Sequence, residues 1–203
     1  WRQPVGAGWS AFSVLGDQAV TQEQRGEQEC VVCYGLLDGK VAWSHSDKAR
    51  FDEVLGGVGP RATPTLTATK VFSLGATGIL NCLNFSDGSP LWSLNLLEKY
   101  GCSNQSWGKS SSPLLADGKV IVCVGKGSCP GLIAFSQETG EEIWRSPGSE
   151  PGYSSPVLFI LAGRPQVLIL NNTVLASHSP GDGAILWDHP WPGSRPKVSQ
   201  PVA

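Results

Sequence analysis

The sequence contains six cysteines, and the spacing between them indicates whether they could attach a haem, bind zinc or form a disulfide. Cys30 and Cys33 form a C-x-x-C pair, but Tyr34 follows them where haem attachment requires a His. A structural zinc site would need a second pair at similar spacing, and the sequence has none. Residues three apart in a strand point to opposite faces, so Cys30 and Cys33 are not expected to bond to each other.

Histidine and serine offer no better candidate for catalysis. His45 and His189 each follow a Trp by two residues, at equivalent positions far apart in the chain, and no shared metal site with His178 is expected. The run Ser110–Ser112 lacks the G-x-S-x-G pattern that surrounds a hydrolase nucleophile. The sequence therefore predicts no catalytic, cofactor-binding or metal-binding residue.

The tryptophans mark a repeat that organises the whole chain. A small residue, an Asp or Thr five positions later, a Gly directly after it and a Trp four residues beyond recur in four segments, 33–43, 82–92, 134–144 and 177–187. The closing Trp residues are 43 to 52 positions apart, and self-similarity at such a period is typical of repeat architectures. The positions that define the repeat are Gly39, Trp43, Gly88, Trp92, Gly140, Trp144, Gly183 and Trp187.

Each repeat has the pattern of four short strands. Residues 78–85 alternate between apolar and polar, Asp87-Gly88 is a strong hairpin signal, and residues 90–94 return as an outer strand. A polar residue followed by Pro marks a first strand near residue 64, and residues 71–74 form the second. Four short antiparallel strands per repeat predict an all-β fold, a β-propeller with blades at about 8–46, 61–96, 109–146 and 153–188.

The two ends of the sequence fit the same period. Trp1 precedes Trp43 by 42 residues and is expected to close an earlier blade, whereas residues 197–202 match the first strand of a later one. We therefore expect residues 1–203 to be a single propeller segment of four blades that belongs to a larger ring. Isolated, its open ends would favour aggregation or pairing of two such segments.

Composition narrows the range of partners. The formal net charge is −2 and there is no run of Lys or Arg, so nucleic acid is not an expected partner. The longest apolar run, near residues 157–162, is far too short to span a bilayer. Proteins, together with the remaining blades of the same ring, are the expected partners.

The cysteines outside the C-x-x-C pair divide into two groups. Cys82, like Cys33, lies ten residues before a repeat Trp, and Cys123 lies in an apolar strand, so these three are expected in the core. Cys102 precedes the third blade, and Cys129 lies in the loop between its second and third strands. These two connections emerge on one face of a four-stranded blade, so a Cys102–Cys129 disulfide is feasible, with two free loop thiols as the alternative.

The repeats distinguish between propeller families. Only Trp187 is followed by the Asp of a WD repeat, and Gly56-Gly57 is a single pair where kelch repeats carry one in every blade. The four segments, 134–144 above all, resemble the tryptophan-docking repeat of the pyrroloquinoline-quinone-like (PQQ-like) quinoprotein propellers, especially BamB-like envelope proteins and related planctomycete propellers. The resemblance implies a ring of about seven or eight blades and a periplasmic, cell-envelope or secreted location in a bacterium.

The resemblance also frames the function. The alcohol dehydrogenases of this group bind PQQ and calcium in a funnel beside adjacent disulfide-bonded cysteines, and no adjacent Cys pair occurs here. Asp38, Asp87 and Asp182 fall in predicted turns, where solvation explains them. We therefore predict a non-catalytic scaffold for protein interaction, without a cofactor. The alternatives are a fragment of a PQQ-dependent alcohol or sugar dehydrogenase, which would use PQQ and calcium, and a propeller fused to another enzyme.

One group of residues is a candidate binding surface. Four residues lie three or four positions before the Pro of a first strand, where they could ring one mouth of the central channel together with aromatic neighbours. Such a cationic funnel would bind an acidic peptide or a small anion, and solvated strand ends are the alternative. The candidate residues are Arg61, Lys109, Tyr153, Lys197 and Trp107, with Trp9 nearby.

Overall fold

The computed structural model describes residues 1–124, 129–148, 150–193 and 196–202. Strands dominate these residues, and the helix α1 (Leu96–Tyr100) is a single short one. The chain forms two compact units. Unit 1 comprises Trp1–Asn95 and Asn104–Ser112, and unit 2 comprises Leu96–Ser103 and Pro113–Ala203.

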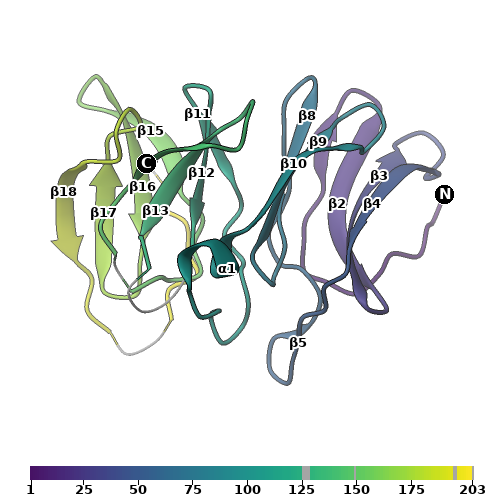
Figure 1. The fold of residues 1–203 in the computed structure, drawn as a ribbon, viewed down its shortest axis with the longest axis horizontal. Helices are drawn as coiled ribbons and strands as arrows, with labels where there is room; N and C mark the ends of the chain where they lie inside the picture. Colours follow the sequence, from purple (N-terminus) through teal and green to yellow (C-terminus); the bar gives the residue numbers. More distant parts are fainter. Residues whose placement is uncertain (125–128, 149, 194–195, 203) are drawn as a thin grey trace. The chain divides into compact units, whose positions relative to one another are not determined.

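Unit 1 contains two four-stranded antiparallel sheets whose strands follow one another in sequence order (Figure 1). The first sheet consists of β1 (Ser13–Leu15), β2 (Gln18–Arg25), β3 (Gln28–Gly35) and β4 (Val41–Asp47). The second consists of β7 (Thr65–Leu66), β8 (Lys70–Leu74), β9 (Ile79–Asn84) and β10 (Pro90–Asn95). A small hairpin of β5 (Asp52–Glu53) and β6 (Gly57–Val58) lies in the loop between the two sheets.

Unit 2 repeats this arrangement after α1. Its first sheet consists of β11 (Leu114–Ala116), β12 (Lys119–Cys123), β13 (Leu132–Ser136) and β14 (Glu142–Arg145). Its second consists of β15 (Val157–Leu161), β16 (Arg164–Leu170), β17 (Val174–His178) and β18 (Ile185–Pro190). The prediction of four propeller blades with four antiparallel strands each is confirmed, and the innermost strand of the first blade begins at Ser13.

The turn between the third and fourth strands explains the most regular part of the repeat. In the second blade the Gly88 N–H donates to the Asn84 carbonyl at 2.9 Å, and the Asn84 N–H donates to the Ser89 carbonyl at 2.8 Å. Gly88 has a φ of 73°, a left-handed conformation that Gly adopts at low cost. The pairing register shifts between Pro90 and Trp92, as expected where one strand carries an extra residue. Equivalent bonds form at Gly39, Gly140 and Gly183.

The residue before this Gly stabilises the turn. The Asp87 carboxylate accepts hydrogen bonds from the Ser89 hydroxyl at 2.7 Å and the Ser89 N–H at 2.9 Å. These bonds lower the pKa of Asp87. Thr139 does the same with its hydroxyl, which accepts the Glu141 N–H at 3.2 Å. An Asp or Thr at this position is therefore explained by a local side-chain to backbone bond.

Alternate residues along the strands build the core between neighbouring sheets. In unit 1, one face of the first sheet packs against one face of the second, and the contact buries Val20, Val31, Cys33, Trp43, Val71 and Leu83. In unit 2 the equivalent contact buries Ile121, Cys123, Leu132, Ala134, Trp144, Val167, Ile169 and Ala176. Each large apolar side chain buried here contributes about 1.5–3 kcal/mol to stability.

The repeat Trp of one blade lies on the turn of the next blade. The Trp43 indole covers Gly88, where an added Cβ would overlap its ring, and Trp43 Nε1–H donates to the Phe85 carbonyl at 2.9 Å. In unit 2, Trp144 covers Gly183 in the same way and donates to the Pro180 carbonyl at 3.1 Å. The Gly of each turn is thus required both for its φ and for the space above it.

Trp1 makes this contact within the first blade. Its indole lies against Gly39, and its Nε1–H donates to the Leu36 carbonyl at 2.9 Å. The three carbonyls that accept these bonds occupy the same position, three residues before the Gly. The first blade therefore presents the same turn surface to a Trp as the second and fourth.

We expect Gly88→Ala to destabilise unit 1 far more than Gly16→Ala, as measured by chemical denaturation. Both glycines have a positive φ, but nothing lies within 4 Å of a Cβ at Gly16. The left-handed conformation should therefore cost about 1 kcal/mol at either position. In Gly88→Ala the added methyl group must also displace Trp43, which should lower the free energy of unfolding by about 3 kcal/mol more. Equal losses in the two variants would show that the Trp contact contributes nothing.

Candidate functional site

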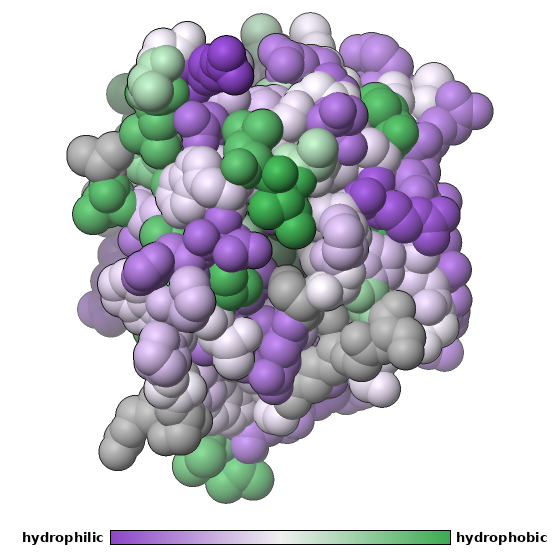
Figure 2. Space-filling model, turned by 90° about the vertical axis from the view of Figure 1, so that its left-hand side faces the viewer, coloured by the Kyte–Doolittle hydropathy of each residue, from purple (hydrophilic) through white to green (hydrophobic). Residues whose placement is uncertain are grey.

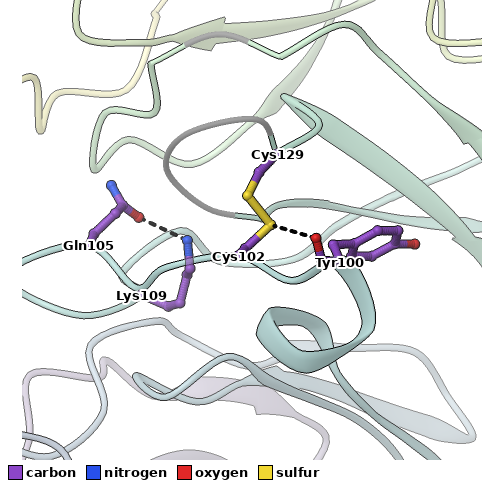
Figure 3. The surroundings of a disulfide bond; sticks show 5 residues. All are labelled: Tyr100, Cys102, Gln105, Lys109 and Cys129. Atoms are coloured by element: carbon purple, nitrogen blue, oxygen red, sulfur yellow. Dashed lines mark hydrogen bonds between the residues drawn. A yellow bond between two sulfur atoms is a disulfide. The ribbon is translucent and has the colours of Figure 1, made fainter.

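A disulfide fixes the segment that leads into the third blade. Cys102 follows α1 and is bonded to Cys129, with their Cα atoms 5.9 Å apart (Figure 3). Two further contacts hold α1 on the same sheet: the Tyr100 hydroxyl donates to Glu142 at 2.6 Å, and the Lys99 ammonium lies 5.6 Å from the centre of the Phe135 ring. Burial and the bond to Glu142 raise the pKa of Tyr100. The disulfide is therefore one part of an anchored segment.

Lys109 requires a correction to the predicted cationic funnel. Its side chain is completely buried, not exposed at a channel mouth. The ammonium donates to Gln105 Oε1 at 3.1 Å (Figure 3), and the backbone N–H donates to the Ala76 carbonyl at 3.0 Å. The reason is that residues 104–112 fold into unit 1, where Gln105 and Ala76 bond to the Lys109 ammonium and backbone N–H.

The other predicted funnel residues make mainly local contacts. The Arg61 guanidinium lies 4.4 Å from the centre of the Phe51 ring and donates to the carbonyls of Gly57, at 2.8 Å, and Gly59. Trp107 is half-buried in the same unit. In unit 2 the Tyr153 N–H donates to the Lys197 carbonyl at 2.7 Å, so these two residues are neighbours. A mouth shared by residues of both units stays a prediction.

The acidic residues of the turns are engaged in structural bonds. The carboxylates of Asp38 and Asp182 each accept the backbone N–H two residues later at 3.1 Å, as Asp87 does in the second blade. These hydrogen bonds lower the pKa of both carboxyls, with the Lys40 N–H as the main cause for Asp38 and the Ser179 hydroxyl for Asp182. Over the described parts of the chain, no three His, Cys, Asp or Glu side chains are placed to hold a metal ion.

One buried polar network was not predicted from the sequence. Strand β2 is polar, yet Thr21 through Gln24 are all buried. Glu23 lies at its centre: it accepts hydrogen bonds from the Tyr34 hydroxyl at 2.7 Å and the Arg25 guanidinium at 2.8 Å. Burial and this bond to Glu23 raise the pKa of Tyr34 to about 12. The available signal was the polarity of β2, because the second strands of the third and fourth blades are apolar at residues 120–123 and 167–170.

Unit 1 also contains a cavity of about 370 Å³ beside its two innermost strands. Its hydroxyls take part in bonds between blades: Ser13 donates to the Pro64 carbonyl at 2.5 Å, and Ser112 accepts the Thr63 N–H at 3.0 Å. Neutral hydroxyls and carbonyls suit an uncharged polar group rather than a metal ion. The lining residues are Ser13, Val14, Thr63, Pro64, Thr65, Leu66 and Ser112.

The hairpin of β5 and β6 displays apolar side chains at its tip. Figure 1 shows it at the end of a loop that extends away from the first sheet. Val54 is 97% exposed and Leu55 is 82% exposed. The tip is nevertheless well held, because the Glu53 carboxylate accepts the N–H groups of Leu55 at 3.0 Å and Gly56 at 2.6 Å. The Trp9 indole donates to the Gly56 carbonyl at 2.7 Å and is itself 70% exposed.

The outer strand β18 is a second place where apolar side chains reach the surface. Ile185 and Leu186 are each 46% exposed, and Trp187 is 38% exposed. The Trp187 indole donates to Gln166 Oε1 at 2.8 Å within its own sheet. Figure 2, which views the side of the molecule that includes β18, shows apolar side chains in small groups among polar ones.

Comparison with known proteins identifies the family. A sequence model of the family described as outer membrane protein assembly factor BamB matches residues 11–202. The chain belongs to this BamB family. The match covers all four blades of the structure and confirms the resemblance to PQQ-like repeat proteins. No curated protein matches the chain, and no helix among the described residues is long and apolar enough to cross a membrane.

Solved structures similar to this BamB-family chain are propeller proteins of two kinds. The quinohemoprotein alcohol dehydrogenase of Comamonas testosteroni aligns with a TM-score of 0.67 and 16% identity, over 91% of this chain and 35% of that one. BamB of Moraxella catarrhalis aligns with a TM-score of 0.61 and 16% identity, over 88% of this chain and 47% of that one. A europium-containing methanol dehydrogenase aligns with a TM-score of 0.55 and 11% identity, over 93% of this chain and 52% of that one. These identities show the fold, and the chain spans about a third to a half of each relative.

We expect the Cys102→Ser/Cys129→Ser variant of this BamB-family chain to lose about 3 kcal/mol of stability, given the 27-residue separation of the two cysteines. Reduction of the wild type with dithiothreitol should cause a similar loss and leave the variant unchanged. Thiol titration of the denatured, unreduced chain should count the four cysteines that are free in the structure, namely Cys30, Cys33, Cys82 and Cys123. A count of six thiols would contradict the disulfide.

Proposed function

We propose that this chain is part of a non-catalytic propeller that serves as a protein-interaction scaffold in the bacterial cell envelope. The observation that carries the proposal is the hairpin of β5 and β6, which holds Val54 and Leu55 in solvent on a well-bonded turn. Exposed apolar side chains on a pre-organised segment are typical of binding surfaces, because little conformational entropy is lost when a partner binds.

The family supports the same proposal. Its description names an outer membrane protein assembly factor, and BamB of Moraxella catarrhalis shares the fold of the four blades. A role in assembly requires contacts with other proteins rather than a reaction. The envelope location is likewise inferred from this family. Partner identity, total blade count and any further domain belong to the longer proteins of which such blades form a part.

A dehydrogenase fragment is the second candidate, and the alignment with quinohemoprotein alcohol dehydrogenase over 91% of the chain favours it. Two features of the described residues support the scaffold over this alternative. The Asp side chains of the turns accept backbone N–H groups, and the residues around the cavity of unit 1 include no carboxylate. Under this alternative, other blades of the ring would supply the cofactor site.

The two candidates differ in cofactor binding. We expect titration of the full-length protein with PQQ and calcium to give no saturable change in absorbance up to high micromolar cofactor. Dye-linked oxidation of alcohols and sugars should also be absent. Saturable binding with turnover would overturn the scaffold proposal and establish the dehydrogenase.

The interaction role has its own test. We expect Val54→Asp/Leu55→Asp to reduce recovery of a cross-linked envelope partner at least about tenfold, because apolar residues at the centre of an interface dominate its affinity. Leu37→Asp is the matched control, since Leu37 is 88% exposed on a different turn of the same unit. The partner must then bind the wild-type protein and the control, but not the double variant, when all are purified. Equal binding by the three proteins would exclude the hairpin as the interaction surface.

A further inference from the structure

The contact between the two sheets of unit 1 is apolar over one part and polar at one end. Its apolar part includes Val31 and Trp43 of the first sheet. Glu29 lies two residues before Val31, and its register partner is Asp47, four residues after Trp43. Because alternate residues of a strand share a face, Glu29 and Asp47 point toward the second sheet. Two carboxyl groups therefore lie at one end of the buried contact.

The second sheet places neutral polar residues opposite these two carboxyl groups. Val71 and Leu83 belong to the same apolar contact, and Ser73 and Asn81 lie two residues further along each strand on the same face. Ser73 and Asn81 are register partners, and both are almost completely buried. The other blades lack this arrangement: at the position of Asn81 they have Val32, Ile133 and Ala176.

Direct bonds join the two sets of residues. The Glu29 carboxylate accepts the Ala76 N–H at 2.7 Å and the Thr77 hydroxyl at 2.9 Å, so it holds the turn between β8 and β9. Asp47 accepts the Asn81 amide at 2.6 Å. On its other oxygen, Asp47 lies 3.3 Å from His45 Nε2. These bonds connect the first blade to the second.

The cluster contains buried polar atoms without hydrogen-bond partners. Asn81 Oδ1 and Ser73 Oγ are buried oxygen atoms with no hydrogen-bond partner among the described residues. The Ser73 hydroxyl can donate as well as accept, whereas Asn81 Oδ1 can only accept. A buried acceptor without a donor is costly, and a bound proton would supply one.

Within the described part of the chain, neither Glu29 nor Asp47 forms an ion pair with a Lys or Arg side chain. From the first sheet, β2 brings the neutral Gln22 and Gln24 to the same face, and β4 brings His45. The second sheet contributes the neutral groups of Ser73, Thr77 and Asn81. Lys109 reaches the same turn through its backbone N–H, while its ammonium bonds to Gln105.

We propose that Glu29 and Asp47, with His45 beside them, form a proton-binding clamp that tightens the contact between the first two blades as the surroundings acidify. A proton on one carboxyl removes part of the repulsion between the pair and adds a donor to the cluster. The clamp is a pH-sensitive element built into the buried contact of unit 1.

The pKa of Glu29 is shifted in the direction that the clamp requires. Burial raises the pKa of Glu29, the charge of Asp47 raises it further, and the hydrogen bonds from Ala76 and Thr77 only partly oppose them. A carboxyl whose pKa is higher in the folded than in the unfolded protein binds its proton preferentially in the folded state. Its contribution to stability is therefore complete below the ordinary pKa of Glu and is lost as the pH rises through the raised value.

The experiment compares denaturant unfolding of the wild type and of Glu29→Gln at pH 7, 6, 5 and 4. The wild type should become more stable relative to Glu29→Gln as the pH falls, by at most about tenfold in the folding equilibrium constant per pH unit for the one proton that Glu29 takes up. Glu29→Gln has no titrating carboxyl at this position and should lack this part of the dependence. The matched control is Glu27→Gln, because the Glu27 side chain is 79% exposed and two residues away, and it should keep the wild-type dependence.

A second measurement covers the case in which Glu29→Gln does not fold. The Glu29 carboxyl carbon can be followed by NMR in the wild type, where its titration midpoint should lie above the ordinary value for Glu. Asp47→Asn removes the neighbouring charge and should lower that midpoint. An ordinary midpoint in the wild type, or an unchanged pH dependence of stability in a folded Glu29→Gln, would overturn the clamp.

Discussion

The packing of an indole ring on the glycine of the next turn is the contact on which the remaining structure depends. It combines a large buried apolar surface with a hydrogen bond to a carbonyl three residues before the glycine, and it leaves no room for a Cβ. The turn beneath the indole requires a residue with a left-handed backbone conformation. It also requires a preceding Asp or Thr whose side chain accepts a backbone N–H. The contact and its turn therefore account for three of the four positions by which the repeat is recognised, namely the Asp or Thr, the Gly and the Trp.

The parts of the fold that follow from such local rules could be predicted from the sequence. The turn at Gly88 and the alternation of residues 78–85 depend on neighbours within a few positions, so the four-stranded antiparallel blades were predicted correctly. Lys109 and the polar strand β2 could not be placed in this way. Their burial depends on partners outside the segment that carries them, such as Ala76, whose carbonyl accepts the Lys109 N–H, and Tyr34, which donates to Glu23. The Cys102–Cys129 disulfide was predictable only in part. Blade geometry places the two connections on one face, but it does not decide between a disulfide and two free thiols.

The same distinction applies to the candidate sites. The predicted funnel used residues chosen by their position before a first strand, but Arg61 and Lys109 are engaged with their own unit. The polar cluster around Glu29 had no sequence signature, because its members come from four strands and a turn. Register, rather than motif, brings Glu29 beside Asp47 and Ser73 beside Asn81. In a repeat fold, residues that depart from the repeat at buried positions are therefore the ones to examine for function.

The path of the chain after the second blade affects the order in which the protein can be made. Residues 96–103 belong to unit 2, residues 104–112 return to unit 1, and the third blade follows. During synthesis, unit 1 cannot be completed until residue 112 has left the ribosome. By then α1 and Cys102 have already emerged and must wait for Cys129, β13 and β14 before they can pack. The two pairs of blades are consequently not separable by a single cut, and Cys102 can form its disulfide only after Cys129 has been synthesised.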